Sequence, residues 1–195
     1  MDYSTASYVW MNNPDPNLFS GTCYVDNLFI ELIGEVDGSS GTPNGNEAVL
    51  AFRLTNYGWR AEFWTYRADG TTYAIITALH VNTPTSNFLY IKLNDDGTIT
   101  YFAYTTEGNG DFAYGTDRSR DYGDWINDFY VRVYSLCEDM SDYPSGASVQ
   151  FHDYKIYSDG SWQTPPNICE VYNDMVHEGW GSSCHPASST LTITK

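Results

Sequence analysis

Carboxylates spaced along one predicted strand are the first residues of this chain that could do chemistry. Residues 31–37 read Glu-Leu-Ile-Gly-Glu-Val-Asp, which places Glu31, Glu35 and Asp37 on one face of a regular strand. Same-face neighbours on a strand lie about 6.5–7 Å apart. Inverting glycosidases use two carboxyl groups about 6.5–9.5 Å apart, and retaining ones use a pair about 5–5.5 Å apart. Glu31, Glu35 and Asp37 are therefore candidate catalytic residues, with solvated carboxylates at a strand end as the alternative.

Aromatic side chains form the second candidate site. Tyr, Trp and Phe make up 16% of the chain, and several stand at alternate positions in strand-like runs. Sugar rings pack on Trp and Tyr through their C–H groups, and their hydroxyls need acids, amides or arginine nearby. The candidate ligand-binding residues on these runs are Trp64, Tyr66, Arg67, Tyr130, Arg132 and Tyr134. Ordinary packing of the rings within a β-sandwich is the alternative role.

Oxygen-bearing side chains also allow a calcium site. Calcium takes about six to eight oxygen ligands from carboxylates, carbonyls and water. The candidate metal ligands are Asp26, Glu31 and Asp153, with Asp124, Asn127 and Asp128 as a second set. The sequence contains no EF-hand loop and no Cys-x-x-Cys pair, so neither that calcium motif nor a zinc site with paired cysteines is expected.

Other kinds of catalysis have little support in the sequence. No Gly-x-Ser-x-Gly turn and no phosphate-binding glycine loop is present. A uronate lyase needs a base and a cation, and the histidines available as bases are His80, His152, His177 and His185. The acidity of the chain would repel polyuronates.

The acidic composition limits the classes of partner. The chain of 195 residues has 9 Lys and Arg against 25 Asp and Glu, a formal net charge of −16. Binding to phosphate backbones or anionic lipids needs clustered basic residues, so no nucleic-acid partner is expected. No stretch approaches the roughly 20 apolar residues of a membrane span, and the first residues lack the apolar segment of a signal peptide. These features predict no membrane insertion.

The cysteines indicate an oxidising compartment. They are Cys23, Cys137, Cys169 and Cys184, and an even number in a chain of this composition favours two disulfides and a secreted protein. Four cysteines allow three pairings. We favour Cys169–Cys184, because that segment has little apolar periodicity and would gain from a cross-link, which leaves Cys23–Cys137. Four buried thiols are the alternative.

Short strand-like runs follow one another along most of the chain. They cover residues 23–36, 48–56, 59–68, 72–81, 88–93, 98–105, 128–136, 147–158 and 190–194. Asp96-Gly97 between two of these runs is the clearest hairpin turn. Short strands at near-regular spacing, without a helical period, predict one all-β domain over residues 1–195. Residues 159–185 read as an irregular loop region tied by a disulfide.

One strand carries a local irregularity. Val149 and Phe151 share one face of the run 147–158, whereas Tyr154 and Ile156 follow the opposite register. A shift of one residue moves every side chain to the other face. A β-bulge at His152-Asp153 would absorb the shift and re-aim Asp153.

The stretch 88–158 resembles the second half of concanavalin A-like and laminin-G-like jelly-roll sandwiches. The resembling pieces are 88–93 followed by Asp96-Gly97, then Trp125 with 129–133, and then 149–156. Calcium-binding carbohydrate modules of this kind are similar in their last strand, with two acids where this chain has His152-Asp153. The resemblance implies an antiparallel jelly roll. Glu35-Val36-Asp37 also resembles the start of the Glu-x-Asp-x-x-Glu motif of retaining β-glucanases, but the closing glutamate is replaced by Ser40.

These features predict a secreted, glycan-binding β-sandwich that uses an aromatic sheet face, with calcium as a candidate structural ion. A polysaccharide-degrading enzyme of the same fold, either a glycoside hydrolase or a lyase, is the first alternative. The second is a structural subunit of an extracellular filament or coat. In that case residues 3–10 or 190–194 would complete the sheet of another copy, so self-assembly is a further expectation.

Overall fold

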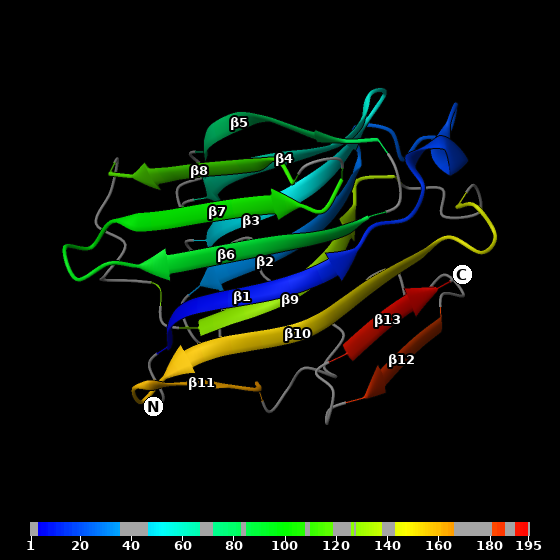
Figure 1. The fold of residues 1–195 in the computed structure, drawn as a ribbon. Helices are drawn as coiled ribbons and strands as arrows, with labels where there is room; N and C mark the ends of the chain where they lie inside the picture. The colour runs from blue at the N-terminus through cyan, green and yellow to red at the C-terminus, as the bar shows by residue number, and fades with distance from the viewer. Residues whose placement is uncertain are drawn as a thin grey trace.

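A computed structural model describes residues 4–35, 47–66, 72–82, 85–107, 110–118, 126, 128–137, 143–165, 181–185 and 190–194. Two antiparallel sheets stack face to face (Figure 1). The predicted all-β fold, a sandwich of two antiparallel sheets, is confirmed. Within the described ranges the helical structure is one 3-10 turn, η1 (Pro16–Phe19), where the Asp15 side chain accepts a hydrogen bond from the Asn17 amide.

The eight-stranded sheet runs in the order β12-β13-β10-β1-β6-β7-β8. The short strand β11 pairs with the last residues of β10, 156–158, whereas β13 pairs with its first residues, 148–151. The strands of this sheet are β1 (Ser4–Asn12), β6 (Ser86–Leu93), β7 (Ile99–Thr105), β8 (Phe112–Asp117), β10 (Ser148–Ser158), β11 (Ser161–Gln163), β12 (Gly181–His185) and β13 (Thr190–Thr194). The first strand of the chain therefore lies in the middle of this sheet, between β10 and β6.

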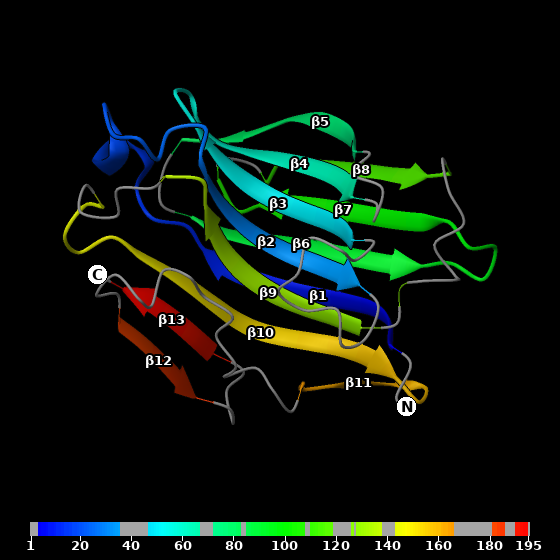
Figure 2. The ribbon, with the colours of Figure 1, turned by 180° about the vertical axis from the view of Figure 1, so that it is seen from behind.

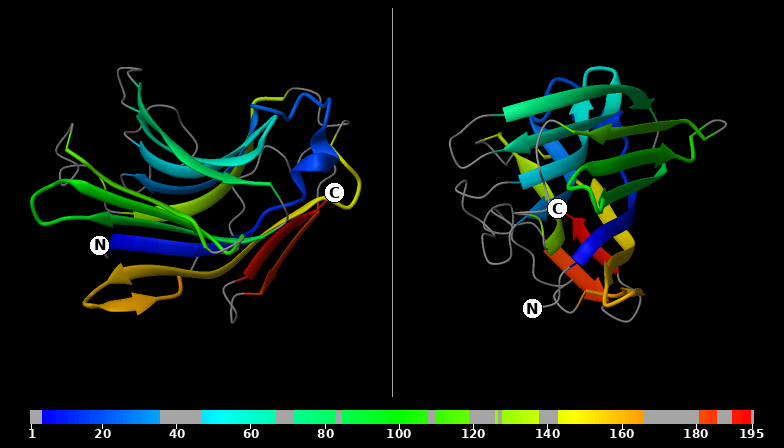
Figure 3. Two further views of the ribbon diagram at one scale, coloured as in Figure 1. Left: turned by 45° about the horizontal axis from the view of Figure 1, so that its top comes forward. Right: turned by 90° about the vertical axis from the view of Figure 1, so that its left-hand side faces the viewer.

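The five-stranded sheet has the order β5-β4-β3-β2-β9 and is seen from its outer side in Figure 2. Its strands are β2 (Leu28–Glu35), β3 (Glu47–Thr55), β4 (Gly58–Tyr66), β5 (Thr72–Val81) and β9 (Asp128–Ser135). Figure 3 shows the two sheets as separate layers, with the strands of this second sheet strongly bent.

The core lies between the sheets and is built from alternate residues of strands such as β2, β3 and β4, together with Phe19 of η1 and Tyr24. Its largest fully buried side chains include Trp59, Tyr24, Phe19, Phe52 and Phe63. The Phe63 ring stacks on the Tyr101 ring at 4.5 Å between centroids, which joins β4 to β7 across the layers. Buried aromatic contacts of this kind supply much of the apolar area that stabilises a sandwich.

The predicted bulge in β10 is confirmed. Tyr8 pairs with Lys155 and Trp10 with His152, so β10 carries one more residue than β1 between the two pairs. Asp153 takes up the extra residue with a φ of +52°, a conformation that Asp tolerates better than most residues. On either side of it, Phe151 and Tyr154 both point into the core.

The disulfide Cys23–Cys137 is present, with 5.7 Å between its Cα atoms. It ties the segment before β2 to the end of β9, which confirms this half of the predicted pairing. Cys169 lies outside the described residues, so the Cys169–Cys184 bond stays a prediction. Cys184 belongs to β12, a strand within the region that the sequence suggested to be irregular.

Several local predictions are refined by the structure. The Asp96-Gly97 hairpin is confirmed, with Gly97 at φ +76° and its amide donating to the Asn94 carbonyl at 2.9 Å. Residues before Leu28 form turns instead of the predicted start of a strand at 23. Strand β8 was missed because its exposed rings and Gly115 gave no strong alternation. No helix among the described segments is long and apolar enough to cross a membrane.

Candidate functional site

Charged side chains gather on the outer face of the five-stranded sheet. The inner face of β2 carries Leu28, Ile30 and Leu32 into the core, so alternation turns Glu31 outward. The register then places Arg132, Glu31, Ala51 and Glu62 side by side across β9, β2, β3 and β4. Ala51 is the small residue of this row, so the two glutamates flank a position with little side chain.

Glu31, Arg132 and Glu47 form the first charged group. The Arg132 Nε donates to the Glu31 Oε2 at 2.6 Å, and its Nη2 lies 4.0 Å from the Glu47 Oε2. Glu31 is only 1% exposed and Glu47 is 8% exposed. One guanidinium therefore serves two buried carboxylates, tightly on one side and loosely on the other.

Glu62, Arg60 and Arg53 form the second charged group. The Arg60 guanidinium makes a short ion pair with Glu62, and the Arg53 Nη1 lies 3.7 Å from the same carboxylate. The Arg53 Nε also donates to the Asp26 carbonyl at 3.0 Å. Glu62 thus has two arginine partners, which compensate the cost of burying its charge.

Burial changes the acidity of the first group. Loss of hydration raises the pKa of Glu31, and the opposing effect of the Arg132 guanidinium does not cancel it. Burial also raises the pKa of Glu47, against the effects of Arg132 and of a hydrogen bond from Tyr130. Burial lowers the pKa of Arg132, but Glu31, Tyr130 and Glu47 together raise it above its ordinary value, so the guanidinium stays charged.

Aromatic rings border the charged residues on the same face. Phe29, Ile33, Val49, Ala51 and Trp64 form a second buried cluster, against which Tyr130 and Tyr134 pack. The Arg132 guanidinium lies over the Tyr134 ring at 4.9 Å, a favourable cation–π distance. The face therefore combines carboxylates, arginines and apolar rings within a few neighbouring strands.

This arrangement could act on a polarised carbonyl group. A carboxylate with a raised pKa can take up and return a proton near its working pH. A fixed guanidinium beside it can stabilise negative charge that develops on an oxygen. Glu47 fits the first role best, because its contact with Arg132 is loose, whereas Glu31 is fully buried beneath the same arginine.

Of the predicted catalytic carboxylates, Glu31 is the one whose side chain the structure describes. Glu31 lies in the charged row and Glu35 ends the same strand, opposite Glu47 on β3. The side chain of Glu35 and the whole of Asp37 lie outside the described residues. Glu47 and Glu62 were missed, because neither belongs to a recognisable motif; their relation to Glu31 becomes visible only once β2, β3 and β4 are in register.

Of the predicted ligand-binding residues, Trp64, Tyr130, Arg132 and Tyr134 lie on the outer face of the five-stranded sheet. Trp64 is 7% exposed and packs edge-on against Phe29, so it offers no open platform. Arg132 is engaged by Glu31. Tyr130 and Tyr134 are half-buried beside it. The side chain of Tyr66 and the whole of Arg67 lie outside the described residues.

The predicted metal ligands are not brought together. Asp26 lies before β2 and pairs with Arg53 at 3.7 Å, Glu31 lies on the outer face of the five-stranded sheet, and Asp153 lies on the bulge of β10 in the other sheet. Asp124 and Asn127 lie outside the described residues. Within the described part of the chain, no group of three or more His, Cys, Asp or Glu side chains could hold a metal ion. Calcium binding stays a prediction.

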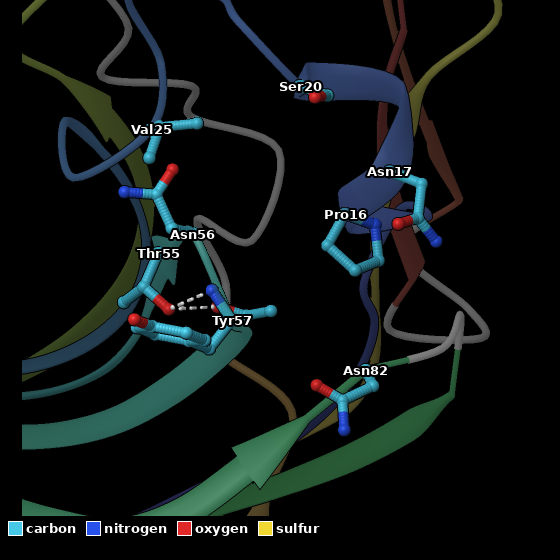
Figure 4. Close-up of a pocket in the computed structure, with 9 residues that line it drawn as sticks. Pro16, Asn17, Ser20, Val25, Thr55, Asn56, Tyr57 and Asn82 are labelled. Carbon is cyan, nitrogen blue, oxygen red and sulfur yellow. Dashed lines mark hydrogen bonds between the residues drawn. The ribbon is translucent and has the colours of Figure 1, made fainter.

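A pocket of about 590 Å³ lies at the end of the sandwich, between η1 and the turn that joins β3 to β4 (Figure 4). Its lining is uncharged and includes Asn17, Asn56, Tyr57 and Asn82. The Thr55 hydroxyl accepts from the Tyr57 amide and donates to the Gly58 carbonyl, which fixes one wall. Glu47 is the first residue of β3, and Thr55, which lines the pocket, is the last. The pocket is therefore separate from the first charged group.

No protein-family model matches the chain, and no curated protein matches its sequence. Solved structures do match its fold. A crystal structure of scytalido-glutamic peptidase with a transition state analog inhibitor superposes with a TM-score of 0.61 at 13% identity, covering 98% of this chain and 92% of that one. A second, with a peptide-based transition state analog, gives a TM-score of 0.62 at 11% identity and the same coverage.

A third match is SCP-B, a member of the Eqolisin family of peptidases, in a complex with the tripeptide Ala-Ile-His. It gives a TM-score of 0.59 at 11% identity and covers 100% of this chain and 94% of that one. These matches overturn the prediction of a lectin-like, polysaccharide-binding sandwich. The three matched structures, each covering nearly all of this chain, are peptidases, and the ligand named with SCP-B is a peptide. The alternative of a polysaccharide-degrading enzyme of the same fold agrees with these matches better than the main prediction does, because the matched proteins are enzymes, although they are named as peptidases.

Proposed function

We propose that this chain is a peptidase that hydrolyses peptide bonds at the outer face of its five-stranded sheet. The observation that carries the proposal is the Glu47–Arg132–Glu31 group. It contains a buried carboxylate of raised pKa, loosely paired with a guanidinium that a second carboxylate holds in place. The similarity in fold to peptidases supports the choice of substrate.

In the proposed reaction Glu47 is the general base and then the general acid. The ionised carboxylate takes a proton from a water molecule, whose oxygen forms a bond to the carbonyl carbon of the substrate. The charge that develops on the carbonyl oxygen is stabilised by Arg132. Glu47 returns the proton to the amide nitrogen, the carbon–nitrogen bond breaks, and the products are a carboxylic acid and an amine. Glu31 acts as a positioning residue through its bond to Arg132 at 2.6 Å.

The experiment is a cleavage assay with an unfolded protein as substrate, from about pH 3 to pH 8, read by mass spectrometry. New peptides are expected with the wild type and not with Glu47→Gln. At low pH the rate of cleavage should follow the ionisation of Glu47, so the rate should fall as the pH drops below the raised pKa of that group. Asp95→Asn, at an exposed position in the β6–β7 turn, is the matched control and should keep full activity.

Peptide binding without hydrolysis is the second candidate. It is favoured by the pairing of Glu31, Glu47 and Glu62 with arginines, which leaves each carboxylate with a charged partner. Absence of cleavage across the whole pH range, in a folded protein, would remove the peptidase proposal. Retention of the peptide under the same conditions would then support the second candidate.

The cross-link supports a proposal about the compartment. The Cys23–Cys137 disulfide fits an oxidising environment, and we infer that the protein is secreted. Measuring the chain in the medium and in the cells of its source organism tests this; retention inside the cells in reduced form would contradict it.

A further inference from the structure

Two rows of rings cross the outer face of the eight-stranded sheet. Strands β10, β1, β6, β7 and β8 lie side by side in that order (Figure 1). Residues directly opposite one another form the first row, which is His152, Trp10, Phe88, Tyr104 and Phe112. The second row is Lys155, Tyr8, Tyr90, Phe102 and Tyr114. We call these ten residues, with Trp162 of β11, the aromatic face.

The rings of the aromatic face contact one another across the strands. Trp10 lies 5.0 Å from Phe88 and 6.2 Å from Tyr104 between ring centroids, and Phe102 lies 5.9 Å from Phe112. Trp162 packs edge-on against Tyr8 at 4.8 Å. These distances are typical of attractive aromatic pairs, so the face is a continuous layer of rings and not a set of isolated side chains.

The layer is open at both of its edges. Phe112 is 66% exposed, Tyr114 is 64% exposed and Trp162 is 43% exposed. Large apolar side chains gathered at one exposed place mark binding surfaces more often than isolated ones do. Binding of an apolar ligand at these edges would remove the exposed rings from water.

The charge of the aromatic face differs from that of the rest of the chain. The net charge is −16, yet neither row contains a carboxylate. One carboxylate borders the rows: Asp153, the bulge residue between His152 and Lys155, whose Oδ2 lies 3.3 Å from the His152 Nδ1. The sequence has Lys92, Lys155 and Lys195 as its lysines. Lys155 lies opposite Tyr8, and Lys92 lies on the same face two residues beyond Tyr90. The ammonium groups favour a ligand that carries carboxylates beside its apolar part.

The spacing of the rows suits an extended polypeptide. Strands β1, β6, β7 and β8 each contribute two residues in positions i and i+2, whereas β10 contributes His152 and Lys155 on either side of its bulge. The rows are therefore about 7 Å apart on four of the five strands, the same-face spacing of an extended chain. The five strands span about 19 Å, so the two rows cover on the order of 300 Å². A specific dimer buries about 800 Å² on each partner, and a second copy would bring a second charge of −16. Both facts favour a peptide over a second copy.

We propose that the aromatic face is an exosite that binds extended, apolar segments of polypeptide substrates flanked by acidic residues. It lies on the opposite sheet from Glu47 and Arg132, so it would hold a substrate chain without taking part in its hydrolysis. The proposal rests on the proposed function, because the function supplies polypeptides as ligands.

The test measures binding of a fluorescein-labelled peptide, Glu-Phe-Ser-Leu-Ser-Phe-Glu, by fluorescence anisotropy at neutral pH. The protein is Glu47→Gln, so cleavage does not enter the result and a failure of the peptidase proposal leaves this measurement intact. The double change Phe112→Ser with Tyr114→Ser should weaken binding about tenfold or more. Tyr57→Ser removes a ring that is 79% exposed at the far β3–β4 turn and should leave binding unchanged.

The flanking charges give a second readout. A peptide with Lys in place of both Glu should bind at least several-fold more weakly, and Lys92→Glu should remove this preference. The exosite is refuted if the double change leaves affinity unaltered, or if Tyr57→Ser weakens binding equally. It is also refuted if the protein sediments as a dimer that the double change dissociates, because the aromatic face then serves a second copy.

Discussion

Replacing Arg132 by methionine tests the electrostatic account of the candidate site most directly. Methionine keeps the length and much of the packing of the side chain but removes the partner of Glu31, whose carboxylate is 1% exposed and bonded to Arg132 at 2.6 Å. Removing one partner of a buried ion pair costs about 3–5 kcal/mol, because the remaining charge is left without compensation. Arg132→Met should lower the free energy of unfolding at pH 7 by that amount.

The loss in free energy of unfolding caused by Arg132→Met should be smaller at low pH than at pH 7. Burial already raises the pKa of Glu31, and removing Arg132 removes an effect that lowers it. A carboxyl group whose pKa is raised in the folded state contributes stability below its unfolded pKa of about 4.3, and this contribution is lost as the pH rises through the folded pKa. The deficit of Arg132→Met should therefore shrink to about 1–2 kcal/mol near pH 4, where mainly packing is lost.

Urea unfolding followed by tryptophan fluorescence at pH 7 and pH 4 provides the measurement. The double variant Glu31→Gln with Arg132→Met leaves no buried charge and should stay within about 2 kcal/mol of the wild type at both pH values. Arg53→Met is the matched control, because Arg53 is more exposed and its ion pairs are 3.7 Å long, so about 1 kcal/mol is expected. A cost below about 1 kcal/mol at pH 7 for Arg132→Met, or an equal cost at both pH values, would refute the reasoning.

Three further changes test other parts of the fold by the same unfolding measurement. Replacing Cys23 and Cys137 by serine opens a cross-link with a sequence separation of 114 and should cost about 5 kcal/mol; a loss under about 1 kcal/mol would contradict its structural role. Asp153→Val should cost about 1–2 kcal/mol at a φ of +52°, whereas Asp153→Gly should be nearly neutral; equal effects would argue against the bulge. Tyr154→Phe removes the buried hydrogen bond to the Phe129 carbonyl at 2.5 Å and should lower the free energy of unfolding by about 1–3 kcal/mol. An unchanged free energy of unfolding would contradict the importance of this bond.

The local features of the fold were predictable because they depend on neighbouring residues. The change of apolar register around Asp153 required an extra residue in the strand, and the bulge lies there. Asp96-Gly97 predicted its hairpin because Gly97 can adopt the positive φ that the turn requires. In both cases the chemistry of two or three adjacent residues restricts the backbone to few conformations.

The contacts on the two outer faces were not predictable, because they depend on pairing between distant strands. Glu31 meets Arg132 over a sequence separation of 101, and only the register of β2 with β9 brings them together. The aromatic face was missed for the same reason. Tyr8 and Trp10 alternate with buried Val9 and Met11, so either set could have been the core until β1 was placed between β10 and β6.

Sequence identity and fold similarity diverge for a physical reason in this sandwich. The inner face of each strand needs only apolar side chains of suitable volume, so many sequences satisfy it. The matched peptidases share 11–13% identity with this chain while covering nearly all of it. The outer faces are less uniform: that of the five-stranded sheet holds a buried apolar cluster beside its charges, and that of the eight-stranded sheet carries rows of rings. Glu31, Glu62 and Arg132 occupy outer positions where apolar residues would cost less to bury. Their presence there adds less to the stability of the sandwich than apolar residues would, as expected if that face has the function proposed for it.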